Sequence, residues 1–253
     1  MGTPLKLTGF VLASLSMFST QVLAYLPEIT FEQPSYQPLH IISHISPDGW
    51  QSVDGVSSIT PTGQGFGGTG QALKIAADPT EGTWLRKPIT WSSSESIAFI
   101  DFRIKPAADP EGSLANFFSN GTQIAFQIPE HETKGELWVL DGDDASSLNP
   151  PPLQAQWLKA PGGYNVPSGQ KVSSDWLRVT LRHDYGRDLW DLFIDGKLAA
   201  VNLGFDGRNG PLQSLDFFGS TTGDTLIDNL AANPVNMLFT DSDKDGLPND
   251  WEI

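Results

Sequence analysis

The stretch WLRVTLRHDYGRDLWDLFIDGKLAAVNL, residues 176–203, decides the fold class of this chain. From Leu177 to Leu181 every second residue is apolar, and the residues between them are polar. Successive side chains of a strand point to opposite faces of a sheet, so this alternation predicts a strand with one buried face. Asp195-Gly196 supplies the positive φ angles that a type I′ hairpin turn requires. The stretch therefore predicts an antiparallel meander of three strands.

Short apolar segments of the same kind recur through the chain, separated by Gly, Pro, Asn and Asp, and helical periodicity is scarce. Segments such as ESIAFIDFRI and GELWVLD predict further strands, and Asn120-Gly121 predicts the tip of a second hairpin. The total is about a dozen strands, which is too many for one open sheet. We therefore expect an all-β fold in which two antiparallel sheets pack as a sandwich.

The first 24 residues have the composition of a secretory signal peptide. Lys6 precedes the apolar run LTGFVLASLSMF, and the small residues Val22 and Ala24 suit a cleavage site. We expect the mature chain to begin at Tyr25, and no later segment is apolar enough to span a bilayer. The expected location is extracellular or at the cell surface. The expected organisation is a sandwich over 25–232, a linker over 233–240 and a calcium-binding segment over 241–253.

The charge and the cysteine count restrict the partners and the sources of stability. The chain has 15 basic and 30 acidic residues, a formal net charge of −15, which excludes nucleic acid as a partner. Such acidity suits metal cations and neutral ligands. There is no cysteine, so no disulfide restrains the unfolded state. The sequence gives no indication of the oligomeric state.

The acidic segment DSDKDGLPNDWE, residues 241–252, has the spacing of a calcium loop, D-x-D-x-D-G-x5-E. Calcium takes six to eight oxygen ligands, and a tightly wound loop turns alternate side chains toward one centre. The alternative is a solvated acidic tail. No helix-length segment follows, so an EF-hand is not expected. The predicted Ca²⁺ ligands of this segment are Asp241, Asp243, Asp245, Leu247 through its carbonyl, Asn249 and Glu252.

The sequence shows no complete catalytic motif. His40 and His44 are four residues apart, but no glutamate lies between them, and the segment is rich in β-branched residues. The G-x-G-x-x-G pattern within residues 63–70 precedes a predicted strand rather than a helix, so it predicts a loop and not a phosphate site. A polysaccharide-cleaving enzyme is kept as the alternative function, because paired carboxylates could arise from the fold.

A polar excursion rich in Pro, Gly and Ser, residues 141–169, predicts a ligand-binding loop. Aromatic rings stack on the apolar faces of sugars while polar neighbours take the hydroxyls. Trp157 and Tyr164 are the predicted stacking residues, and Asp143 and Asp144 are predicted to contact hydroxyls. The expected partner is an extracellular glycan or cell-surface polymer, and a protein-contacting adhesion module is a further alternative.

The order of five segments is similar to that of the concanavalin A-like, laminin G-like jelly-roll superfamily over roughly residues 29–232. The segments are ITFEQPSY, GQALKIAAD, ESIAFIDFRIKP, WLRVTLRHDYGRDLWDLFIDGKLAA and DTLIDNLAA. The superfamily contains sugar-binding and adhesion modules as well as some glycanases and polysaccharide lyases, so the resemblance does not decide function. The E-x-D-x-E strand of the related glucanases and the Arg, Gln-x-His and Tyr strands of the alginate lyases are absent, which counts against an enzyme.

The resemblance also implies metal sites. In similar carbohydrate-binding modules an acid from each terminal strand shares a structural calcium, which indicates Glu32 and Asp228 here. The alternative is two surface carboxylates beside sheet edges. The segment 241–253 resembles the thrombospondin type 3 calcium repeats, which occur in series. A single copy at the end therefore predicts a fragment, or a repeat that led into a further domain.

Overall fold

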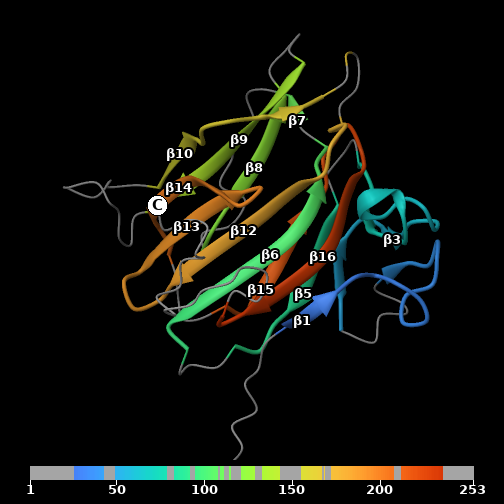
Figure 1. Cartoon of the computed structure of the whole chain (residues 1–253), viewed down its shortest axis with the longest axis horizontal. Coiled ribbons are helices and arrows are strands. Elements are labelled where there is room, and N and C mark those ends of the chain that lie inside the picture. Colours follow the sequence, from blue (N-terminus) through green and yellow to red (C-terminus); the bar gives the residue numbers. More distant parts are fainter. Residues whose placement is uncertain are drawn as a thin grey trace, which may run out of the picture.

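The computed structural model describes residues 26–42, 49–78, 83–91, 95–107, 109–110, 114, 121–128, 133–142, 155–166, 168, 172–207 and 212–235. These residues form a β-sandwich of two layers in which nearly all strands pair antiparallel (Figure 1). The prediction of an all-β, jelly-roll sandwich is confirmed. Within the described ranges, no helix has the length and apolar character needed to cross a membrane.

The first layer is an eight-stranded sheet with the order β14-β13-β12-β6-β16-β4-β3, and β1 joins it beside β16. All its strand pairs are antiparallel. The sheet therefore brings the first described strand against the last. Its strands are β1 Leu26–Ile29, β3 Ser57–Ile59, β4 Leu73–Ile75, β6 Ile97–Lys105, β12 Leu177–Asp184, β13 Leu189–Ile194, β14 Lys197–Gly204 and β16 Thr225–Asn233.

The second layer is divided into a five-stranded sheet, β10-β9-β8-β7 with β11 beside β9, and a three-stranded sheet, β15-β5-β2. The short β7 pairs parallel with β8. A 3-10 turn, η1 Phe66–Gly68, lies in the predicted glycine-rich loop. The strands are β2 Gln51–Asp54, β5 Trp84–Pro88, β7 Asp109–Pro110, β8 Ile124–Ile128, β9 Lys134–Asp141, β10 Gln156–Lys159, β11 Tyr164–Asn165 and β15 Ser214–Phe218.

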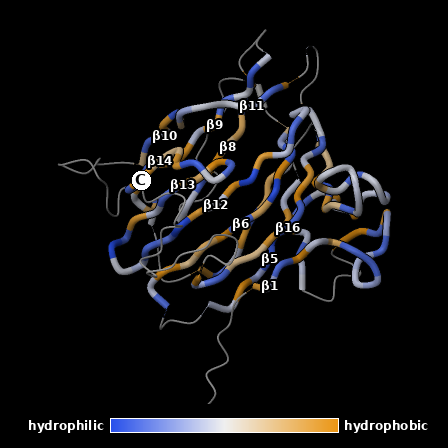
Figure 2. Tube along the Cα trace, in the orientation of Figure 1, coloured by the Kyte–Doolittle hydropathy of each residue, from blue (hydrophilic) through white to orange (hydrophobic). Residues whose placement is uncertain are grey.

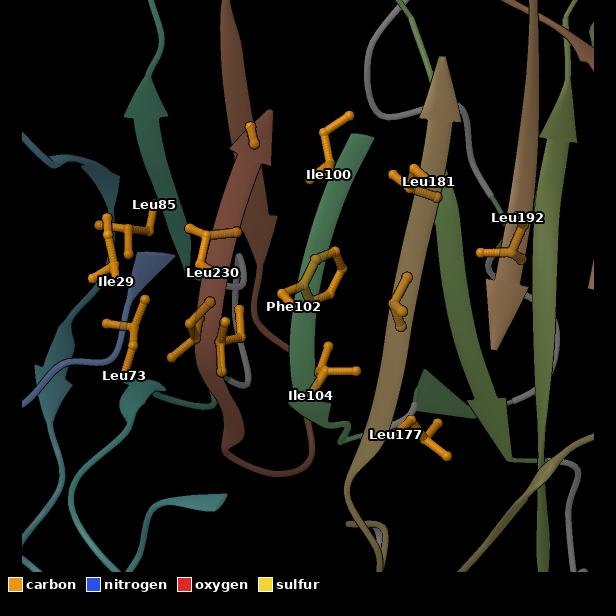
Figure 3. Packing of buried hydrophobic residues seen from close by; sticks show 14 of the residues in the cluster. Ile29, Leu73, Leu85, Ile100, Phe102, Ile104, Leu177, Leu181, Leu192 and Leu230 are labelled. Carbon is orange, nitrogen blue, oxygen red and sulfur yellow. The ribbon is translucent and has the colours of Figure 1, made fainter. Parts of the chain in front are cut away.

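The predicted meander is present as β12, β13 and β14. Asp195 and Gly196 have φ angles of +50° and +75°, as the type I′ turn requires. The apolar side chains of β12 point into the core, as the alternation predicts (Figure 3). The polar face of β12 is also largely covered, because Arg178 and Thr180 both donate hydrogen bonds to Asp101 on β6. Hydrogen bonds to the neighbouring strand therefore help to cover the face that the sequence assigns to solvent.

One hydrophobic cluster joins the two layers, and apolar residues line the strands that face it (Figure 2). The rings of Phe102 on β6 and Phe217 on β15 meet edge to face, with centroids 5.9 Å apart. Leu137 of β9 enters the same cluster from the five-stranded sheet. Trp190 is fully buried and its Nε1 donates to the carbonyl oxygen of Gly204 at 2.9 Å. Both sheets of the second layer therefore pack on the first.

The second predicted hairpin is described only on one side of its turn. Gly121 has a φ angle of +94° and exchanges backbone hydrogen bonds with Asp206, at 2.6 and 3.1 Å. The strand β8 that follows pairs with β9. Residues 115–120 lie outside the described ranges, so the first strand of this hairpin stays a prediction.

The two turns of the meander allow a test of the prediction that Gly196 needs a positive φ angle. Gly196→Ala is expected to destabilise the protein by about 1–2 kcal/mol, because a Cβ at a φ of +75° meets the following carbonyl oxygen. Gly186→Ala, in the turn between β12 and β13, is the matched control, because a Cβ there would have only ordinary contacts, at 3.5 and 3.9 Å. Urea unfolding of both variants measures the difference. Equal stability of the two variants would contradict the turn assignment.

Candidate functional site

Two carboxylates that are far apart in the sequence, Glu32 and Asp228, line one cavity of about 310 Å³. Glu32 follows β1 by three residues, and Asp228 lies in β16. The two strands pair with Ile29 opposite Leu230, so the chain that leaves β1 runs beside Asp228. The two acids indicated for a shared calcium therefore line the same cavity, and their role as calcium ligands stays a prediction. The remaining lining residues are Thr30, Phe66, Thr69 and Asn229.

Both carboxylates hold the glycine-rich loop, residues 63–70, and the residue after it. The backbone N–H of Phe66 donates to Asp228 Oδ2 at 2.9 Å, and the N–H of Gln71 donates to Glu32 Oε1 at 2.9 Å. Gly70 has a φ angle of +59°, and a Cβ placed on it would lie 1.9 Å from Glu32 Oε1. Only glycine therefore allows the loop to approach Glu32 this closely.

The cavity disfavours negative charge on Asp228. Burial, and to a smaller extent repulsion by the neighbouring Glu32 and Glu28, raises the pKa of its carboxyl group to about 6. The backbone N–H groups of Phe66 and Asn229 oppose this rise by hydrogen bonding to the carboxylate. Among the described residues that line the cavity, two are carboxylic acids and none is basic. A bound cation would remove the repulsion between them.

The cavity fits a hard cation. The described lining residues offer carboxylate, hydroxyl and amide oxygens, and none of them carries an imidazole or thiol group, which suits calcium rather than zinc. Among the residues that the structure describes, no group of three or more His, Cys, Asp and Glu side chains could hold a metal ion. A calcium ion between Glu32 and Asp228 would therefore take further oxygens from Thr30, Thr69, Asn229, backbone carbonyls or water.

A second site lies on the outward face of the five-stranded sheet. Leu137 and Val139 of β9 point into the core, so Trp138 between them points outward. In the pairing of β10 with β9, Trp157 lies opposite Leu140 and Lys159 lies opposite Trp138. Trp138 and Trp157 are thus diagonal cross-strand neighbours on one face, a spacing of about 7–8 Å that aromatic side chains can bridge. Both indoles are partly exposed.

Polar groups on the same face hold one of the two indoles in place. Trp138 Nε1 donates to Glu136 Oε2 at 3.2 Å, and Lys159 Nζ pairs with Glu136 Oε1. Trp157 Nε1 is buried and has no hydrogen-bond partner in the described part of the chain. We call Glu136, Trp138, Trp157 and Lys159 the tryptophan surface. It combines two rings with a donor and an acceptor that reach water.

Of the residues predicted to bind sugar, the structure places Trp157 on this surface and Tyr164 in the core. Tyr164 is only 4% exposed, and its ring packs edge to face on Phe126 with centroids 5.8 Å apart. Its hydroxyl donates to the carbonyl oxygen of Gln127 at 3.2 Å. The prediction that Tyr164 is exposed for stacking is wrong, because Gly135 on β9 leaves the space that the ring fills.

The other predicted site residues lie outside the described ranges. These are Asp143, Asp144, Asp241, Asp243, Asp245, Leu247, Asn249 and Glu252. Their roles stay predictions. Trp138 is one of the aromatic residues that the sequence makes available for stacking, but Trp157 and Tyr164 are preferred to it, although the alternation in GELWVLD places Trp138 on the face opposite Leu137 and Val139. That alternation is the signal that could have identified it.

Comparison with known proteins gives information about the fold. No protein-family model and no curated protein matches the chain. A solved sialidase structure is similar with a TM-score of 0.50 and 11% identity, over 88% of this chain and 19% of that chain. The binding domain of botulinum neurotoxin serotype D has a TM-score of 0.41 and 11% identity, over 83% of this chain and 48% of that chain.

A third solved structure is the CBM22-1 xylan-binding domain of Xyn10C from Paenibacillus barcinonensis. It has a TM-score of 0.32 and 12% identity, over 83% of this chain and 93% of that domain. The chain thus spans about half of the neurotoxin domain and about a fifth of the sialidase. At such identities the likeness to the sialidase concerns the fold alone. The chain is a β-sandwich of the kind that the sialidase contains, and the laminin G-like and thrombospondin-like resemblances stay predictions.

Proposed function

We propose that the chain is an extracellular carbohydrate-recognition module in which the tryptophan surface stacks on sugar rings. The observation that carries this proposal is the placement of Trp138 and Trp157, partly exposed, side by side on one face of the five-stranded sheet. An indole offers a rigid apolar face at a low cost in conformational entropy, which suits the apolar face of a sugar ring.

The neighbours of the two rings suit sugar hydroxyls. The carboxylate of Glu136 accepts hydrogen bonds and the ammonium group of Lys159 donates them, and a hydroxyl can do both. Among the described residues the buried Trp157 Nε1 has no acceptor, and a buried donor without a partner calls for an explanation such as a bound water or ligand. A small shift of the indole on binding would let a sugar hydroxyl or a bridging water satisfy it.

We also propose that calcium binds between Glu32 and Asp228 and stiffens the module. The ion would join β1, β16 and the glycine-rich loop, three segments that meet at the cavity. The support is the raised pKa of Asp228 and the carboxylate, hydroxyl and amide oxygens in the lining of the cavity. A second calcium ion would bind the segment 241–252, where the spacing of the acidic residues provides the ligands.

The experiment that tests the function combines binding with turnover. The purified protein is run through affinity gels that contain different polysaccharides, with calcium and with EDTA, and is assayed for reducing sugars and unsaturated products. Retardation without turnover supports a recognition module. Turnover would favour the polysaccharide-cleaving alternative, and the absence of both would favour a protein-contacting adhesion module.

Calcium affinity is expected to fall as the pH drops through about 6, because a proton and the ion compete for Asp228. Without calcium, the stability of the folded protein is expected to change in the opposite direction with pH. The folded pKa of about 6 exceeds the ordinary value of 3.8, so this group adds stability as the pH falls from 7 toward 4. Calorimetric titration at pH 7.5 and pH 5 measures the first effect, with the tail variant Glu252→Gln to remove the second predicted ion. An affinity that is equal at both pH values would contradict the involvement of Asp228.

A further inference from the structure

We propose that the outward face of the three-stranded sheet is a second carbohydrate-binding surface, selective for neutral sugars. The inference rests on the proposed function, since it adds a separate binding surface to the same recognition module. It concerns different strands from those of the tryptophan surface. We call Trp84, Arg86, Asp216 and Phe218 the β5–β15 surface.

The strand register places these four residues on one face. On β5 and β15, Trp84 lies opposite Phe218 and Arg86 lies opposite Asp216. Of the residues between them, Leu85 belongs to the core cluster and Phe217 packs against it. Because side chains alternate along a strand, the four residues of the β5–β15 surface point away from the core.

Asp216 fixes the polar groups of this surface. Its Oδ1 accepts hydrogen bonds from Trp84 Nε1 at 3.1 Å and from Arg86 Nε at 2.7 Å. Its Oδ2 accepts from Arg86 Nη2 at 3.3 Å and from Ser214 Oγ at 3.1 Å. The guanidinium and the indole are therefore held in a fixed orientation before any ligand arrives. Such preorganisation lowers the entropy cost of binding.

The rings of Trp84 and Phe218 form a small apolar surface beside these polar groups. The ring centroids of Trp84 and Phe218 are 5.5 Å apart with an interplanar angle of 37°, and the Arg86 Cζ lies over the indole at 5.1 Å from its centroid. Phe218 is 38% exposed, whereas the adjacent Phe217 is partly buried and packs against the core cluster. The exposed ring of Phe218 thus provides the apolar surface on which a sugar can stack.

The charges of this surface favour a neutral ligand. Arg86 and Asp216 form an ion pair whose side chains are 37% and 25% exposed, so a positive and a negative group cancel within the surface. The chain as a whole carries a net charge of −15, which repels polyanions. Hydroxyl groups accept from the guanidinium and donate to the carboxylate at once. The expected ligand class is therefore neutral polysaccharide rather than uronate-rich or sulfated polymers.

A purely structural role for these residues predicts a different result. Cross-strand aromatic and ionic pairs stabilise sheets by about 0.2–1 kcal/mol each even without a ligand. Under that reading, variants of the β5–β15 surface would change the melting temperature but not polysaccharide binding. Binding and melting must therefore be measured on the same variants.

The test uses Phe218→Ala and Trp84→Ala, with Leu198→Ala as the matched control. Leu198 is a 55% exposed apolar residue on β14, in the other layer. Affinity gels contain arabinoxylan, mixed-linkage β-glucan or galactomannan as neutral probes and polygalacturonate as the acidic probe. For the neutral polymer that binds best, Phe218→Ala is expected to bind roughly tenfold more weakly than the wild type. Leu198→Ala should match the wild type, and thermal melts should show folded variants.

The outcomes separate this inference from the proposed function. If the wild-type protein binds none of the polymers, both fail. If Trp157→Ala abolishes binding while folded Phe218→Ala binds as the wild type does, only the β5–β15 surface fails. Preferential binding of polygalacturonate would overturn the neutral ligand class. Should Trp84→Ala not fold, Phe218→Ala decides the question, because its side chain is the more exposed of the two rings.

Discussion

Replacing Trp157 with alanine is expected to weaken binding to the best neutral polysaccharide by about 2 kcal/mol, roughly 30-fold. The indole provides half of the aromatic area of the tryptophan surface, and Trp138 alone cannot contact the same length of sugar. The effect should appear mainly as faster dissociation, since the change removes contacts rather than charge. Calorimetric titration with an oligosaccharide of that polymer measures it.

The matched control is Leu158→Ala on the same strand. Leu158 is 37% exposed, but it pairs with Val139 and therefore lies on the other face of β10 from Trp157. Its removal should leave the dissociation constant unchanged. If both variants bind as the wild type does while remaining folded, the tryptophan surface is not the binding site.

The second large effect is expected at the cavity that Glu32 and Asp228 line. At a calcium concentration 100 times the dissociation constant, the ion should stabilise the wild-type protein by about 2.7 kcal/mol. Asp228→Asn keeps the size of the side chain but removes the charge, and should lose this stabilisation. Thermal melting in calcium and in EDTA measures the difference.

Two glycines of the same loop provide a sharper control. Gly70 and Gly67 both have positive φ angles, +59° and +75°, so alanine strains the backbone at either position. Only a Cβ at Gly70 would collide with Glu32, because nothing lies within 4 Å of a Cβ at Gly67. Gly70→Ala should therefore lose the calcium response while Gly67→Ala keeps it. Glu252→Gln should also keep it, since that residue belongs to the separate predicted tail site.

Retention of the full response in Asp228→Asn and in Gly70→Ala would place the calcium elsewhere. A response lost in all four variants, Gly67→Ala and Glu252→Gln included, would show that loop strain or general damage is responsible. Neither result would bear on the tryptophan surface, whose residues lie on β9 and β10.

The local pattern of the sequence was sufficient to predict the meander. Alternation along β12 and the Asp195-Gly196 turn follow from side-chain geometry and from the φ angles that these two residues tolerate. What the pattern did not indicate is the division of the second layer into two sheets. That division depends on which strands pair with each other, and the sequence of a single strand does not indicate its partner when the partner is distant in the chain.

The side chains of the site were harder to predict, because their direction depends on neighbouring strands. Tyr164 lies in a polar segment typical of a loop, yet it enters the core where Gly135 of the paired strand leaves room. Trp138 lies between two core residues, Leu137 and Val139, yet it points outward. The prediction that Glu32 and Asp228 lie close together came from the family resemblance. The residues between them in the sequence give no sign that the two acids meet.

The most direct test of the central claim is a ¹H–¹⁵N correlation spectrum recorded as a neutral oligosaccharide is added. The protein has eight tryptophans, and each gives one indole N–H signal that single-tryptophan variants assign. The account predicts that the signals of Trp138 and Trp157 move with saturating sugar while that of the fully buried Trp190 stays in place. Saturable binding that leaves the Trp138 and Trp157 signals unmoved would contradict it.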